Sequence, residues 1–132
     1  MTLKDLLLRI GIAASLVTSA VSHAHLYRHG YQHIPNIGDG FLAQASLSFA
    51  VAPLILVGGP AWLRWTAAAV AGGSIVAFAM SRTIGLMGFL EQGWDPSPYA
   101  AISVAAELVT VVLCVAGRRL IASEKRPRAD VS

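Results

Sequence analysis

The stretch PYAAISVAAELVTVVLCVAG, residues 98–117, decides the fold class of this chain. Its only charged residue is Glu107, and about 20 mostly apolar residues are enough for a helix to cross a membrane core of about 30 Å. The whole chain has the same character, because 55% of its 132 residues are hydrophobic and 13% are charged. That charged share is far below the usual share of a soluble domain. The sequence therefore predicts an integral membrane protein and excludes both a soluble globular domain and a disordered chain.

Three segments upstream of this stretch are similarly apolar. They cover about residues 6–27, 40–59 and 65–89, and they are separated by short linkers. Pro60 divides the second segment from the third, and residues 93–98 divide the third from the fourth. We therefore predict an all-α protein in which residues 1–117 form one domain, a bundle of four transmembrane helices. Residues 118–132 are expected to form a basic tail.

Lysine and arginine residues are distributed unevenly around these spans. Four spans put both termini on one side, and that side carries eight of the ten basic residues. The eight are Lys4, Arg9, Arg64, Arg118, Arg119, Lys125, Arg126 and Arg128. Only Arg28 and Arg82 fall on the other side, so the positive-inside rule predicts cytoplasmic termini in a plasma membrane, the inner membrane in a bacterium. A basic membrane flank also argues against a nucleic-acid partner, and the expected partners are the lipid bilayer and either a larger membrane complex or a second copy of the chain.

A cleaved signal peptide is the alternative interpretation of the first span. Residues 1–24 have a charged start, an apolar middle and the sequence Ser22-His23-Ala24, which fits a small-x-small cleavage site. Cleavage would leave His25 as an N-terminal residue able to chelate copper. The apolar region is long for a signal peptide, so we favour a retained first span.

Glu107 is the most informative polar residue, because it lies near the middle of its span. An unpaired ionisable group in the membrane costs several kcal/mol, so such a residue normally faces the bundle interior and has a function. Ser103, Glu107, Thr110 and Cys114 share one helix face. We therefore expect this face to point into the bundle. Cys114 is the only cysteine, so an intrachain disulfide is excluded.

Arg82 is the predicted partner of Glu107. If the third span continues through the apolar residues 84–89, Arg82 lies at a depth similar to that of Glu107. The two helices are antiparallel neighbours joined by a short loop. The sequence therefore predicts a buried Arg82–Glu107 ion pair.

The first span carries a stripe of small and polar residues. Gly11, Ser15, Ser19 and His23 follow one another at four-residue spacing, and small residues at this spacing allow helices to approach closely. In the second span, Gln44 is expected at a depth similar to that of His23.

The four spans thus each place one polar residue in the outer half of the membrane. These residues, His23, Gln44, Arg82 and Glu107, form the predicted ligand-binding site. The alternative is a polar clasp that only fixes the register of the helices, at about 1 kcal/mol for each hydrogen bond.

All four histidines lie between residues 23 and 33. His25 and His29 are spaced so that both can face one side of a helix, and they are the candidate metal ligands of the chain. Haem ligation is less expected, because bis-histidine sites usually draw on different helices.

Two groups of membrane proteins resemble this chain. Residues 7–11, Leu-Leu-Arg-Ile-Gly, followed by a small-residue helix and three more spans, resemble the DoxX-like small four-helix membrane proteins. The combination of His25-Leu26, Tyr31, residues 34–38 and Phe41-Leu42 is similar to a group of small actinobacterial membrane proteins. Both resemblances imply a four-helix bundle and no particular activity.

The expected function is binding of a small or lipid-like ligand at the predicted site, or service as an accessory subunit of a membrane complex. Two alternatives remain open. One is a metal- or haem-linked redox protein that uses the histidines of residues 23–33. The other is a membrane enzyme in which His23 and Glu107 exchange protons. The sequence contains no recognisable catalytic motif and indicates no particular cofactor.

Overall fold

The computed structural model describes residues 2–124 and 126, and it is all-helical, as predicted. Four long helices and one short 3-10 helix follow in the order α1 (Leu3–Arg28), η1 (Tyr31–His33), α2 (Ile37–Leu56), α3 (Trp62–Arg82) and α4 (Tyr99–Glu124). Each long helix is long and apolar enough to cross a membrane. The prediction of four candidate spans is therefore confirmed.

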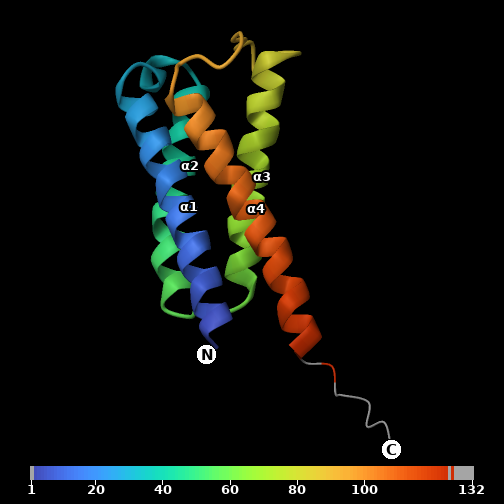
Figure 1. Ribbon diagram of the computed structural model, residues 1–132. Coiled ribbons are helices and arrows are strands. Elements are labelled where there is room, and N and C mark those ends of the chain that lie inside the picture. Colours follow the sequence, from blue (N-terminus) through green and yellow to red (C-terminus); the bar gives the residue numbers. More distant parts are fainter. Residues whose placement is uncertain (1, 125, 127–132) are drawn as a thin grey trace, which may run out of the picture.

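The helices form an up-and-down bundle (Figure 1). The α2–α3 connection, the start of α1 and the end of α4 lie at one end, whereas η1 and the α3–α4 connection lie at the other. Helix α1 packs extensively on both α2 and α4, and α3 packs on α4. Helices α2 and α3 pack on each other much less than α1 does on its neighbours, which leaves space between them.

The α1–α4 contact depends on the small residues that the sequence indicated. Ser15 Oγ and Thr110 Oγ1 are 2.7 Å apart across this contact. A Cβ atom on Gly117 would lie 2.3 Å from Leu8 Cδ2, and one on Gly11 would lie 2.9 Å from a side-chain carbon of Leu113. The stripe predicted in the first span therefore packs against the predicted face of the fourth.

Helix α3 ends earlier than the sequence suggested. It stops at Arg82 instead of continuing through residues 84–89. Gly85 and Gly88 have φ angles of +84° and +80°, and Leu86 and Phe89 exchange two backbone hydrogen bonds of 2.8 Å. Glycine adopts such conformations without steric cost, and a helix cannot continue through them. The predicted continuation was wrong because hydropathy does not report backbone geometry.

Helix α4 is longer than predicted. It continues past Gly117 to Glu124, so Arg118 and Arg119 lie on the helix and not in a separate tail. Arg126 is described, but Lys125, Arg128 and the rest of the predicted tail lie outside the described residues.

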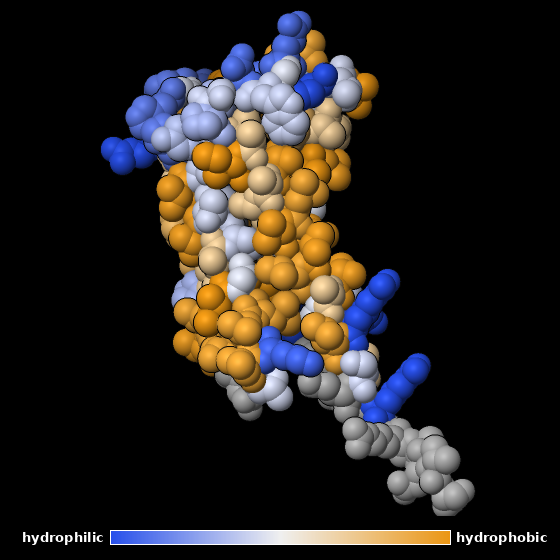
Figure 2. All heavy atoms as spheres, viewed as in Figure 1, coloured by the Kyte–Doolittle hydropathy of each residue, from blue (hydrophilic) through white to orange (hydrophobic). Residues whose placement is uncertain are grey.

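The surface of the bundle has the distribution expected of a membrane protein. Figure 2 shows a hydrophobic belt around the middle and a hydrophilic region at the end that carries η1. Large apolar side chains on the long helices are well exposed, among them Leu47 at 48%, Val76 at 58% and Val112 at 62%. A soluble protein of this size rarely exposes so extensive an apolar surface.

Candidate functional site

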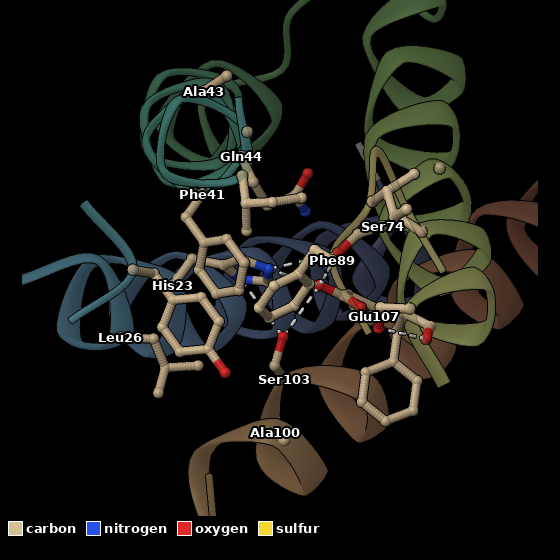
Figure 3. A pocket seen from close by; sticks show the side chains of 18 of the residues that line it. His23, Leu26, Phe41, Ala43, Gln44, Ser74, Phe89, Ala100, Ser103 and Glu107 are labelled. Atoms are coloured by element: carbon tan, nitrogen blue, oxygen red, sulfur yellow. Dashed lines mark hydrogen bonds and ion pairs between the residues drawn. The ribbon is translucent and has the colours of Figure 1, made fainter. Parts of the chain in front are cut away.

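Glu107 is the centre of a buried polar cluster. Its side chain is almost fully buried, and its Oε1 atom accepts three hydrogen bonds from serine hydroxyl groups. The donors are Ser19 of α1 at 3.0 Å, Ser74 of α3 at 2.7 Å and Ser103 of α4 at 3.0 Å. Figure 3 shows Ser74 and Ser103 directed toward this carboxylate. One carboxylate therefore ties three helices together.

His23 lies beside this carboxylate and is held in one orientation. Its Nδ1 atom is 2.9 Å from the backbone carbonyl oxygen of Ser19, which can only accept a hydrogen bond. Nδ1 therefore carries a hydrogen and donates it to this oxygen. The other ring nitrogen, Nε2, lies 3.6 Å from Glu107 Oε1 and 3.4 Å from Ser74 Oγ. The histidine thus directs Nε2 toward the carboxylate.

One proton is shared by these two side chains only in the sense that either can carry it, since Nε2 and Oε1 are 3.6 Å apart, beyond hydrogen-bond distance. When it resides on His23 Nε2 or on Glu107, the cluster carries no net charge, which is the state that an apolar interior favours. The three hydroxyl donors stabilise negative charge on Oε1 without adding a positive charge of their own. The cluster is therefore suited to staying neutral as a whole.

Arg82 does not pair with Glu107, so the predicted ion pair was wrong. Its Nη1 atom is 3.0 Å from Glu91 Oε2, and its Nε and Nη2 atoms donate to the backbone carbonyl oxygens of Gly93 and Asp95 at 3.0 and 2.6 Å. The guanidinium group also lies 4.2 Å from the centre of the Phe78 ring. The physical reason is the early end of α3, which places Arg82 at the end of the bundle beside the α3–α4 connection.

Glu91 also joins this connection to η1, because the hydroxyl group of Tyr31 donates a hydrogen bond to Glu91 Oε1. Burial, and then the hydrogen bond to Glu91, raises the pKa of Tyr31. The ring of Tyr31 stacks on Phe41 at 4.4 Å and meets Phe89 edge-on at 5.9 Å. Tyr31, Arg82 and Glu91 link η1 to the α3–α4 connection, and they are called the outer clasp below because they lie at the end of the bundle that the sequence predicts to be outside.

A pocket of about 470 Å³ lies between the polar cluster and the outer clasp. All four residues of the predicted site, His23, Gln44, Arg82 and Glu107, line it. They do not form a single layer, since Arg82 belongs to the outer clasp. Most of the remaining lining is apolar, and volumes of about 300–1,000 Å³ are typical of ligand pockets.

The pocket opens sideways between α2 and α3. Its lining includes Gly40, Ala43 and Leu47 of α2 and Ala69 and Gly73 of α3, and all five are exposed. A Cβ atom at Gly73 would meet nothing within 4 Å. Because these residues belong to the two neighbouring long helices that pack least on each other, this opening faces the apolar belt.

Two polar atoms in the wall of this pocket are buried without a hydrogen-bond partner. They are Gln44 Nε2, a donor, and Glu107 Oε2, an acceptor when the carboxylate is ionised. Among the described residues only Arg9 Nη1 and Ser48 Oγ share this condition, and neither residue lines the pocket. Buried polar groups nearly always have partners, so these two atoms are the strongest sign of a ligand.

The candidate metal ligands show a different arrangement. The rings of His25 and His29 stack at 4.0 Å, and Tyr99 stacks on His25 at 3.9 Å. His29 Nδ1 is 2.7 Å from the backbone oxygen of His25 and so donates to it. Over residues 2–124 and 126, no three histidine, cysteine, aspartate or glutamate side chains gather closely enough to hold a metal ion. Within the described part of the chain, a metal at this stack would have His25 and His29 as candidate ligands and no third histidine, cysteine or carboxylate.

Sequence reasoning missed Ser74, Tyr31 and Glu91. The signal for Ser74 was present, because it is a polar residue in the middle of the third span, directly after Gly72 and Gly73. Tyr31 and Glu91 lie in connections, where sequence periodicity gives no information on contacts.

No protein family, curated protein or solved structure matches this chain. The resemblance to DoxX-like proteins and to small actinobacterial membrane proteins therefore stays a prediction.

Proposed function

We propose that this chain is a multi-pass protein of the plasma membrane that binds a lipid-like molecule in the pocket between α2 and α3. One observation carries the proposal: the pocket opens toward the apolar belt and holds two buried, unpartnered polar atoms, Gln44 Nε2 and Glu107 Oε2. An amphiphile matches both features, since its chain can lie in the apolar opening while its polar group reaches the cluster.

The route of entry follows from the groups at each side of the pocket. At the end that carries η1, the outer clasp and the apolar residues Leu86 and Phe89 line the pocket, and the clasp links η1 to the α3–α4 connection. An apolar chain that entered from water would have to pass these polar groups. A ligand in the bilayer meets only small or flexible side chains at the α2–α3 opening, so we propose lateral entry from the membrane.

The leaflet follows from the proposed orientation. In the sequence, eight of the ten basic residues lie near the two termini or the α2–α3 connection, which supports cytoplasmic termini. The pocket then lies in the outer half of the membrane. Between the two expected roles, ligand binding is favoured over that of an accessory subunit, because the unpartnered atoms lie inside a pocket and not on an outer surface.

Photo-cross-linking tests the proposal. Hexadecanol with a diazirine group midway along its chain is added to vesicles that contain the protein, and labelled peptides are identified by mass spectrometry. Labelling is expected on the α2 and α3 segments that line the opening. A Gly73→Leu variant should lose most of this labelling, because the leucine side chain fills the opening.

Gly72→Leu is the matched control, since Gly72 is the neighbouring residue of the same helix, its Cβ position is also open, and it does not line the pocket. Equal labelling of Gly73→Leu and Gly72→Leu would overturn the proposal.

A further inference from the structure

We infer that the ligand of this pocket is an uncharged amphiphile whose polar group is a free hydroxyl group. This inference rests on the proposed function and adds the chemical class of the ligand. It follows from three properties of the site: the charges that are already paired, the polar atoms that are not, and the direction of the opening.

Paired charges exclude a strongly charged head group. Arg82 is the only basic residue in the lining apart from His23, and its guanidinium group is occupied by Glu91 and by two backbone oxygens. A carboxylate or phosphate would therefore find no open positive charge, and it would approach the Glu107 carboxylate. An ammonium group would be compensated only if the cluster gave up the shared proton, and the ammonium and the carboxylate would then both have to remain out of water.

The unpartnered atoms require a group that both donates and accepts. Gln44 Nε2 needs an acceptor, and Glu107 Oε2 needs a donor when the shared proton resides on His23. When the proton resides on Glu107 instead, the ligand must accept from the carboxyl group. A hydroxyl group is suited to both states because it carries one hydrogen and two lone pairs. An ester or ether oxygen only accepts, so it leaves an ionised Oε2 without a partner.

The two unpartnered atoms belong to side chains that line the same pocket from different helices. Gln44 projects from α2 toward the side of the pocket where Ser74 lies, and Glu107 borders the same space from α4 (Figure 3). The apolar remainder of the ligand then extends toward the α2–α3 opening, past Ala43 and Gly73. Ligands of this class are long-chain alcohols and neutral lipids with a free hydroxyl group.

Four probes with the same diazirine-bearing hexadecyl chain test the head group. They end in a hydroxyl, a methyl ether, a carboxylate and an ammonium group, and each is cross-linked to the protein in phosphatidylcholine vesicles at equal membrane concentration. We expect the alcohol to label the pocket roughly tenfold more than each of the others, because each of these leaves a buried polar atom or a charge without a partner. In a Glu107→Gln variant, whose amide nitrogen can donate to an ether oxygen, the preference for the alcohol over the methyl ether should fall severalfold.

The outcomes separate this inference from the proposed function. If all four probes label the pocket equally and Gly73→Leu abolishes this labelling, the hydroxyl class is overturned and the proposed binding function stands. Preferred labelling by the ammonium or the carboxylate probe would also overturn it. Labelling by no probe, or labelling that Gly73→Leu leaves unchanged, would overturn the proposed function itself.

Discussion

Replacing Glu107 by leucine should destabilise the bundle more than any conservative change on the same helix face. The side chain is 1% exposed, and its Oε1 atom holds the hydroxyl groups of Ser19, Ser74 and Ser103. Hydrogen bonds between membrane helices contribute about 0.6 kcal/mol on average and at most about 1.7 kcal/mol, so the two from Ser19 and Ser74, which come from other helices, are worth about 1–3 kcal/mol. The freed serine hydroxyl groups can turn to backbone carbonyl oxygens of their own helices. The expected loss of unfolding free energy is therefore about 2 kcal/mol.

Glutamine at the same position is the matched control. Glu107→Gln keeps one oxygen that can accept from the serines, so its expected loss of unfolding free energy is below about 1 kcal/mol. The assay is unfolding of the purified protein in mixed micelles with rising SDS content, followed by tryptophan fluorescence. In the Glu107→Leu background, Ser74→Ala should cost less than in the wild type, because its hydrogen-bond partner is already absent.

Two results would refute this reasoning. One is a Glu107→Leu variant that unfolds at the same SDS content as the wild type, which would mean that the three hydrogen bonds add nothing to stability. The other is a Glu107→Gln variant as unstable as Glu107→Leu, which would mean that charge and not hydrogen bonding holds the cluster.

Two further predictions concern packing and topology. Gly117→Ala should destabilise the α1–α4 contact by about 1–3 kcal/mol through overpacking against Leu8, and a second change, Leu8→Ala, should relieve part of that loss. The control is Gly72→Ala, which should be neutral or stabilising because its Cβ position is open. A neutral Gly117→Ala variant in the same SDS titration would contradict the close contact. In a protein without Cys114, a cysteine introduced at exposed Gln92 should react with a membrane-impermeant maleimide from outside intact cells and one at Ser123 should not; the reverse pattern would invert the proposed orientation.

The fold and half of the polar cluster could be predicted because helical periodicity fixes which residues share a face. The spacing of Ser15, Ser19 and His23 in one span and of Ser103 and Glu107 in another indicated two stripes, and the structure brings them together. Spacing within a helix depends only on its 3.6-residue turn, so it holds regardless of what the helix packs against.

The partner of Glu107 could not be predicted because it depends on where α3 ends. Residues 84–89 are apolar enough to continue a span, yet the left-handed conformations of Gly85 and Gly88 turn the chain out of the helix. The sequence contains these glycines, but a glycine within an apolar run is equally common inside membrane helices. Ser74 was missed for a related reason: a serine in a helix can bond its own backbone, so its presence does not indicate a partner.

The observed Arg82–Glu91 pair leaves the pocket open, whereas the predicted Arg82–Glu107 pair would have filled it. An Arg82–Glu107 pair would fill the space between the helices with a guanidinium group and would satisfy both carboxylate oxygens. Because Glu91 takes Arg82, the carboxylate of Glu107 is held from one side only, by three short hydroxyl-bearing side chains on Oε1. Oε2 remains without a partner, and the volume that an arginine side chain would occupy stays open to the α2–α3 opening. A cluster that served only to fix the register of the helices would gain stability from closing this gap, so the retained gap favours binding over a purely structural role.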